Sequence, residues 1–327
     1  MARKNRIVLD PDLVERLEAR IGLFHLSQRV LRETETYPDS FRHREIEEIF
    51  PVAACLEFGL RLFGLWGRGR SNTARFQTTE NTVCIANLPD VFEGFRILQL
   101  SDLHFVDEPD SLPELLKVLE DIEYDLCVLT GDYSPGFTES PGLKSKMAQL
   151  QRSIRTETVA ILGNHDSIFM VPWMEDLGIR FLLNESCQID KSGDSITIVG
   201  VDDYHRFRLS NLEKALSNVH SDVIILLEHS PEQYRQAAYA GVDLYLAGHT
   251  HGGQICFPNG FAPKLNIECG RQVGKGSWRF KDMQGYTSRG VGASLVPVRF
   301  NCPPEVVVHL LKKASKERTV SELPGSM

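Results

Sequence analysis

The chain has 327 residues, of which 42% are hydrophobic and 24% are charged, and this composition excludes a disordered, collagen-like or low-complexity protein. Its length exceeds the roughly 250 to 300 residues at which a single core stops growing, so we expect one large domain with an appended segment. The 44 acidic residues outnumber the 36 basic ones, and the net charge of -8 provides no overall field for binding nucleic acid. An anionic ligand would need a site with its own positive charge.

The N-terminal region contains two predicted helices of different character. Residues 10–34 begin with an aspartate and a proline, which are typical of a helix start, and continue with apolar residues at mostly three-to-five spacing. Residues 44–66 are far more apolar, and after Glu48 their only charges are Glu57 and Arg61. These two side chains can pair on one face of a helix.

Two charges near the centre of residues 44–66 disfavour a membrane-spanning helix. An aromatic end and an arginine-rich flank favour a helix that lies in a membrane interface, and the alternative is a helix docked on the main domain or on a second subunit. No apolar region of a cleavable signal peptide follows the basic N-terminus, and seven scattered cysteines without a C-x-x-C pair indicate reduced thiols. We therefore expect a cytoplasmic protein, peripheral on the inner membrane.

Glycines and small polar residues at 64–72 predict a flexible boundary after these helices. From about residue 76 to 312, short runs of leucine and β-branched residues alternate with helical stretches, which is typical of an α/β domain. The predicted organisation is an N-terminal helical segment over 1–72, the main domain over 76–312 and a polar C-terminal tail over 313–327.

Six apolar runs in the main domain end directly in polar residues. The runs span residues 96–100, 126–129, 159–162, 196–199, 223–227 and 244–246. In open α/β sheets, ligands bind at the carboxyl ends of the strands. Polar side chains gathered at these ends therefore predict one shared site.

The polar residues at the strand ends are mostly histidine and aspartate. They are Asp102, His104, Asp132, Asn164, His165, His229, His249 and His251. Imidazole, carboxylate and amide ligands without a thiolate suit Mn²⁺, Fe or Zn²⁺ in a catalytic rather than a structural site. A single D-x-H or H-x-H pair arises often by chance. Five motifs that each follow an apolar run, namely D-x-H, G-D, G-N-H-D, an isolated H and G-H-T-H, do not arise together by chance.

The spacing of these residues predicts how they present their side chains. Asp102 and His104, like His249 and His251, would lie on one face of an extended segment because side chains two residues apart on a strand point the same way. The Asp132 carboxylate has two oxygens, which can bridge two metal ions about 3.5 to 4 Å apart.

Over about residues 95–310, the chain resembles the calcineurin-like metallophosphoesterases. The resemblance lies in the order of five motifs: D-x-H, G-D, G-N-H-D, an isolated H and G-H-T-H. The resemblance implies an α/β fold, a four-layer α-β-β-α sandwich, here with an N-terminal helical extension. It also implies that Asp102, His104, Asp132 and His251 hold one metal ion, and that Asp132, Asn164, His229 and His249 hold the other. His165 would lie beside the substrate as an acid or a stabiliser of the transition state, with Asn164 and Asp132 as further catalytic residues.

Two divalent metal ions would supply the local positive charge that the composition lacks. They lower the pKa of bound water from 15.7 toward roughly 7, so a metal-bound hydroxide would be available for in-line attack on phosphorus. We therefore expect a two-metal phosphohydrolase that cleaves a phosphodiester or pyrophosphate bond in a phosphorylated small molecule or a lipid-linked substrate. A non-catalytic binding module on the same fold is the alternative from another class.

The residues around the motifs distinguish subgroups of this family. Protein serine/threonine phosphatases carry Asp-Arg-Gly soon after Gly-Asp, whereas this chain reads Tyr-Ser-Pro-Gly-Phe at 133–137. Four segments, 248–254, 288–292, 297–300 and 303–305, are similar to a bacterial phosphodiesterase-like branch with N-terminal membrane segments. That branch includes a UDP-2,3-diacylglucosamine pyrophosphatase of lipid A synthesis. The better-known lipid A pyrophosphatase has arginine where this chain has His165. A soluble nucleotide phosphodiesterase is the remaining alternative.

Five further features invite a functional interpretation. Gly252 could let a loop approach the substrate, and Arg289 could grip a substrate phosphate with its guanidinium fork. Arg299 could do the same or form a surface ion pair. The acidic segment 202–205 is interpreted as a turn, and Asp166 either orients the ring of the preceding histidine or caps its loop.

Overall fold

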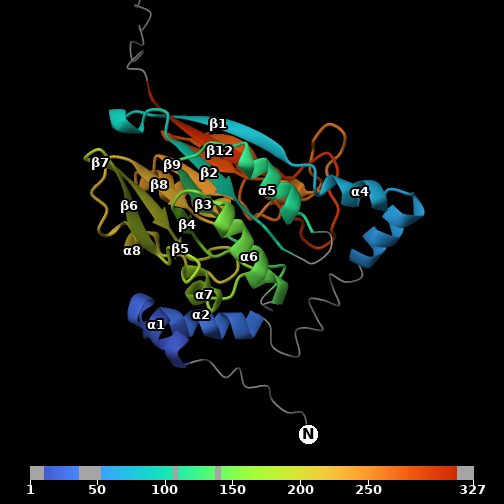
Figure 1. Cartoon of the computed structure of the whole chain (residues 1–327), viewed down its shortest axis with the longest axis horizontal. Helices are drawn as coiled ribbons and strands as arrows, with labels where there is room; N and C mark the ends of the chain where they lie inside the picture. The colour runs from blue at the N-terminus through green and yellow to red at the C-terminus, as the bar shows by residue number, and fades with distance from the viewer. Residues whose placement is uncertain (1–10, 37–52, 106–109, 137–140, 315–327) are drawn as a thin grey trace, which may run out of the picture.

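The computed structural model describes residues 11–36, 53–105, 110–136 and 141–314. Two six-stranded mixed sheets form its centre (Figure 1). The first sheet has the order β1 (Gln77–Ile85), β12 (Glu305–Lys313), β2 (Arg96–Leu100), β3 (Leu126–Leu129), β4 (Thr158–Ala160) and β5 (Ile179–Phe181). The second has the order β10 (Gly276–Phe280), β11 (Met283–Thr287), β9 (Leu244–Ala247), β8 (Ile224–Leu227), β7 (Asp194–Gly200) and β6 (Glu185–Lys191).

Helices lie around the two sheets. They are α1 (Pro11–Ile21), α2 (Leu23–Thr36), residues 53–62, α4 (Trp66–Asn72), α5 (Leu112–Glu120), α6 (Pro141–Ser153), α7 (Met170–Glu175), α8 (Leu212–Leu216) and α9 (Tyr234–Tyr239). Helices α1, α2, α5, α6 and α7 share a buried apolar cluster with the first sheet, and α8 and α9 share one with the second. A third cluster lies between the sheets. The predicted four-layer α-β-β-α sandwich is therefore confirmed.

The apolar runs form strands because both of their faces are buried. In β9, Leu244 and Leu246 face the cluster between the sheets, while Tyr245 and Ala247 face the outer helices. This two-residue alternation, with apolar partners on either side, explains why the runs are continuously apolar rather than alternating with polar residues. All six predicted runs lie on or overlap strands of the structure.

Parallel pairing brings the predicted site residues to one edge. Strands β2, β3, β4 and β5 are parallel to one another, and so are β7, β8, β9 and β11. The carboxyl ends of the parallel strands in each sheet therefore open into neighbouring loops, as expected for a ligand site in an α/β fold.

The N-terminal helix predicted over 10–34 is two helices. The chain breaks at Gly22, whose φ of 81° is readily adopted only by glycine, and α2 starts in a new direction. Leu17, Ile21 and Leu26 are buried in the same cluster as α5, α6 and α7. Figure 1 shows α1 and α2 in blue along one side of the molecule, next to α7. The two helices therefore pack as part of the main body, and the division at residue 72 stays a prediction.

The flexible boundary predicted over 64–72 is wrong for residues 66–72, because they form α4. Gly69 is buried there, and a Cβ at this position would lie 2.7 Å from the ring of Phe300. Of the apolar segment 44–66, residues 44–52 lie outside the described residues, and residues 53–62 are helical. Within the described ranges, no helix is both long and apolar enough to cross a membrane.

Two smaller expectations concern the ends and the cysteines. Strand β12 ends at Lys313, and the rest of the predicted tail, from residue 315, lies outside the described residues. All seven cysteines are free, and four of them are buried.

The packing of α1 generates a prediction about stability. Leu17 is 2% exposed in the core cluster, whereas Leu23 at the start of α2 is 62% exposed. We expect Leu17→Ala to lower the free energy of unfolding by about 2–5 kcal/mol, and Leu23→Ala to change it by less than about 0.5 kcal/mol. Urea unfolding followed by circular dichroism measures both. Equal, small effects would show that α1 does not contribute to the core.

Candidate metal centre

The predicted ligands lie in the loops after the strands, and their backbones are unusual. Residues Asp102, His104, Asp132, His249 and His251 all have positive φ, between 40° and 68°. This left-handed conformation costs energy for residues with a Cβ and clusters at functional sites. The expectation that the D-x-H and H-x-H pairs lie on extended segments is therefore wrong. The chain turns sharply at these five ligands instead, and the turns direct neighbouring side chains into one site.

The first cluster contains Asp102, His104 and His251, all of them buried. Nε2 of His104 lies 3.1 Å from Nε2 of His251, which in turn lies 3.4 Å from Oδ1 of Asp102. Oγ of Ser101 donates to Oδ2 of Asp102 at 2.6 Å. The backbone N–H of His249 also points at this carboxylate, 3.0 Å from both oxygens.

The second cluster contains Asp132, His229 and His249, with Asn164 between them. Oδ1 of Asn164 lies 3.0 Å from Nε2 of His229 and 2.8 Å from Nδ1 of His249. Oδ2 of Asp132 lies 3.2 Å from the same His229 nitrogen. The structure thus brings together all seven residues that the sequence predicts as metal ligands.

Asp132, a member of the second cluster, also lies next to a histidine of the first. Its Oδ2 lies 3.5 Å from Nε2 of His104 and 3.2 Å from Nε2 of His229. Its Oδ1 accepts the backbone N–H of His165 at 2.9 Å. The carboxylate therefore stands between the two groups of imidazoles, where a bridging ligand of two metal ions would stand.

The hydrogen bonds of His229 and His104 fix which ring nitrogen faces the site. Nδ1 of His229 donates to the carbonyl oxygen of Thr130 at 2.7 Å, so a neutral ring presents only a lone pair at Nε2. That lone pair faces the oxygens of Asp132 and Asn164. His104 repeats the arrangement, with Nδ1 on the carbonyl of Ser134 at 3.1 Å. Carbonyl partners of this kind fix the imidazoles of metal sites.

The pKa values of the four histidines show which rings are neutral and which is charged. Burial by itself would lower the pKa of His229, but the neighbouring Asp132 carboxylate outweighs burial and raises this pKa to about 10. Burial lowers the pKa of His104 to about 4 and that of His249 and His251 well below the usual range. The imidazoles of His104, His249 and His251 are therefore neutral at pH 7 and can act as metal ligands. His229 holds an extra proton, which a bound cation would replace. The donor set fits two divalent cations.

Close backbone approach requires glycine at one point of the site. A Cβ on Gly163 would lie 2.6 Å from the backbone nitrogen of Asp132 and closer still to its Oδ1. The loop that carries Asn164 can therefore reach Asp132 only with glycine at this position.

Asp166 caps the loops rather than orienting His165. Its buried carboxylate accepts the N–H groups of Gly163 and Asp132, both at 2.7 Å, and that of Tyr133 at 2.9 Å. Burial, helped by the charge of Asp132, raises its pKa to about 7. Of the two interpretations of Asp166, the loop cap is confirmed.

The predicted substrate contacts are already engaged within the chain. The guanidinium of Arg289 lies 2.7 Å from Oε1 of Glu305, and the Cβ that Gly252 lacks would lie 2.7 Å from Cγ of Arg289. Their role in substrate binding stays a prediction. Arg299 is fully buried and donates to the carbonyls of residues 289, 290 and 292. The surface-ion-pair interpretation is therefore wrong, and this side chain holds the loop that packs on Asp102.

Sequence reasoning missed two polar neighbours of His249. The ring of His205 packs on that of His249 with centroids 4.2 Å apart, and its Nδ1 lies 2.9 Å from Glu232. Nδ2 of Asn266 lies 3.3 Å from Nε2 of His249. His205 belongs to the segment interpreted as a turn, and no motif marks Asn266. Only the folded chain brings either residue to the site.

Comparisons with known proteins agree with the geometry. The profile of the calcineurin-like phosphoesterases matches residues 95–253. The chain is 30% identical to the uncharacterized metallophosphoesterase YkoQ of Bacillus subtilis (strain 168), over 65% of this chain and 82% of that protein. It is 29% identical to the uncharacterized metallophosphoesterase YkuE of the same strain, over 73% and 86%, and 30% identical to the phosphodiesterase YaeI of Escherichia coli (strain K12), over 68% and 84%.

A site of this composition on a four-layer sandwich defines a metal-dependent phosphoester hydrolase. The chain belongs to the calcineurin-like phosphoesterase family. The prediction of an enzyme that hydrolyses phosphoric esters with divalent metal ions is confirmed at this level.

The glycine at the site generates a second prediction. We expect Gly163→Ala to push the Asn164 loop away from Asp132 and to lower Mn²⁺ affinity by about 10- to 100-fold, the usual effect of disturbing the support of metal ligands. Gly67→Ala is the matched control, because no atom lies within 4 Å of the Cβ it would add in α4. Isothermal titration with Mn²⁺ measures both. Unchanged affinity in Gly163→Ala would contradict the described loop contact.

Proposed function

We propose that the chain is a two-metal phosphohydrolase that cleaves a phosphodiester or pyrophosphate bond. The observation that carries the proposal is the position of the Asp132 carboxylate, 3.5 Å from Nε2 of His104 in the first cluster and 3.2 Å from Nε2 of His229 in the second. One cation would be held by Asp102, His104, Asp132 and His251, and the other by Asp132, Asn164, His229 and His249. When bound, such a pair activates water at neutral pH and neutralises charge on the phosphoryl group. Mn, Fe and Zn all suit these donors.

His165 is the proposed donor to the substrate. Its Nδ1 is buried and lacks a hydrogen-bond partner in the described part of the chain, while its backbone N–H is held by Asp132. Its ring packs edge-on against His104 with centroids 5.4 Å apart. A buried ring nitrogen without a partner is costly. In the tautomer that carries the proton on Nδ1, a hydrogen bond from His165 to a leaving or non-bridging phosphate oxygen would both satisfy the ring and assist the reaction.

A phosphodiester is the favoured bond class, and a membrane-associated amphiphile is the favoured substrate. One support is that a relative named as a phosphodiesterase aligns over 68% of this chain. Another is the helix over 53–62 and the turn after it, where Phe58, Leu62 and Phe63 are 68%, 68% and 76% exposed. Arg61 stacks over Trp66 with its guanidinium 4.6 Å from the ring. Aromatic and arginine side chains of this kind suit a membrane interface with anionic lipids.

A second apolar feature is a pair of exposed phenylalanines. Phe257 and Phe261 are 55% and 52% exposed, and their rings stack with centroids 6.3 Å apart. They belong to the loop segment that also carries Asn266, the neighbour of His249. Such a pair could cover the apolar part of a substrate whose phosphate lies at the metal ions. UDP-2,3-diacylglucosamine, a nucleotide-linked acylated sugar, combines both parts and is the specific substrate that we propose.

The test compares bis-p-nitrophenyl phosphate with UDP-2,3-diacylglucosamine in vesicles, using Mn²⁺-loaded full-length protein and Asp132→Asn as the blank. We expect both substrates to be cleaved. Phe58→Ser with Phe63→Ser should slow only the lipid reaction, because these side chains contact the vesicle and not the site. His165→Asn should lower kcat on both by about 10²- to 10⁴-fold while Mn²⁺ still binds.

The outcomes separate the parts of the proposal. Cleavage of the simple diester alone would remove the lipid substrate and favour a soluble nucleotide phosphodiesterase. Equal lipid turnover by the Phe58/Phe63 double variant would remove the membrane contact. Failure to cleave either substrate, with Mn²⁺ bound, would contradict phosphodiester hydrolysis.

A further inference from the structure

Helix α2 carries two charged side chains that are buried rather than solvated. Arg29 is 0% exposed and Glu33 is 9% exposed, and Nε of Arg29 donates to Oε1 of Glu33 at 2.8 Å. Burying an ion pair stabilises a fold only if the remaining donors and acceptors also find partners. The other described partners of Arg29 and Glu33 all lie outside α2, in loops of the main body.

Arg29 reaches the segment that follows the candidate catalytic histidine. Its Nη2 donates to the backbone carbonyl of Asp166 at 2.7 Å, and its Nη1 pairs with the buried carboxylate of Asp202. Its guanidinium also lies 3.8 Å from the centre of the Phe207 ring. A single side chain of the N-terminal region thus connects the loop after β4 with the loop after β7.

Glu33 holds the next two residues of the same loop. Its Oε1 accepts the backbone N–H of Ile168 at 2.8 Å, and its Oε2 accepts the hydroxyl of Ser167 at 2.8 Å. Residues 166, 167 and 168 are therefore each hydrogen-bonded to α2. Asn164 and His165 come directly before them in the chain.

The Asn164 loop is thereby held from two sides. On the inner side, the Asp166 carboxylate accepts the N–H groups of Gly163, Asp132 and Tyr133. On the outer side, Arg29 and Glu33 hold its backbone. Charge-assisted hydrogen bonds in a buried setting are short and directional, so this arrangement fixes where the Asn164 amide and the His165 ring lie.

We propose that Arg29 and Glu33 are positioning residues of the hydrolase, which hold the 164–168 loop in the geometry that metal binding and His165 require. The inference rests on the proposed function only for the role of His165. Helices α1 and α2 are then part of the catalytic unit rather than a detachable extension, and the segment 202–205 includes an anchor, Asp202, for Arg29.

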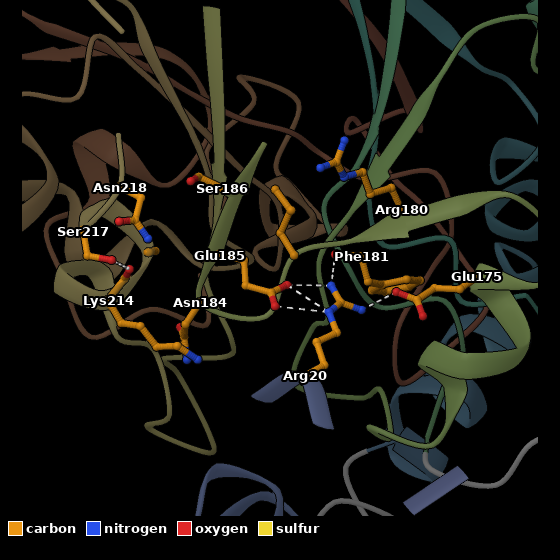
Figure 2. A pocket seen from close by; sticks show the side chains of 12 residues that line it. Arg20, Glu175, Arg180, Phe181, Asn184, Glu185, Ser186, Lys214, Ser217 and Asn218 are labelled. Carbon is orange, nitrogen blue, oxygen red and sulfur yellow. Dashed lines mark hydrogen bonds and ion pairs between the residues drawn. The ribbon is translucent and has the colours of Figure 1, made fainter. Parts of the chain in front are cut away.

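Arg20 on α1 provides a matched control within the same helix pair. Figure 2 shows its guanidinium between Glu175 and Glu185, at the wall of a pocket of about 630 Å³. It lies 2.6 Å from Oε2 of Glu185, pairs with Glu175 and donates to the carbonyl of Phe181. Arg20 therefore fastens the N-terminal helices to the body, as Arg29 does, but none of these contacts is to residues 163–168.

The experiment compares Arg29→Met with Arg20→Met in the Mn²⁺-loaded full-length protein. Both should lower Tm, because both remove buried or half-buried ion pairs. Only Arg29→Met should lower kcat on bis-p-nitrophenyl phosphate, by about 10- to 100-fold with little change in KM, and weaken Mn²⁺ binding. Only this variant should also speed hydrogen exchange of the amides of residues 163–168. Glu33→Gln, whose amide oxygen can still accept from Ile168, should lie between Arg29→Met and the wild type.

The proposal would be overturned if the Arg29 and Arg20 variants had equal kcat, equal Mn²⁺ affinity and equal hydrogen exchange at residues 163–168. Arg29 would then only attach α2 to the main body. If Arg29→Met does not fold, Arg29→Lys replaces it, because lysine keeps the charge but loses the fork that serves Glu33, Asp166 and Asp202 together. If the wild type cleaves no diester, the proposed function fails. Mn²⁺ affinity and exchange at residues 163–168 then still decide the positioning role.

Discussion

The rest of the site depends on one carboxylate, that of Asp132, which stands between two groups of buried imidazoles. Charge of one sign cannot be buried there without the other, so the site is balanced only when a proton or a cation accompanies the Asp132 oxygens. Without a metal ion, a proton on His229 balances the Asp132 charge, and the pKa of His229 is therefore high. In the family to which the chain belongs, divalent metal ions generally supply the balancing positive charge.

The surrounding structure keeps these groups together against their tendency to separate. Sharp left-handed turns aim the ligands inward, and the Asp166 carboxylate joins the loops after β3 and β4 from within. Arg29 and Glu33 hold the same loop from outside. Strained loops persist only where their surroundings over-determine them. The N-terminal helices thus serve the site from a part of the sequence that carries no motif.

Features that repeat locally were predictable, and features that depend on distant contacts were not. The apolar runs predicted the strands because both faces of each strand are buried, and the histidines and aspartates after them predicted the two ligand clusters. The break at Gly22 was missed because the apolar spacing continues through it. The pairing of Arg29 with Asp202 was missed because more than 170 residues separate them. The burial of Arg299 was missed as well. Charge alone does not tell a buried anchor from a solvated side chain.

The central claim is that two metal ions share the Asp132 carboxylate. Anomalous diffraction at the manganese absorption edge, from crystals of the full-length protein grown with Mn²⁺, tests it most directly. The account predicts two peaks about 3.5 to 4 Å apart on either side of Asp132, one against His104 and His251 and the other against His229 and His249. A single peak, or peaks away from these residues, would contradict it.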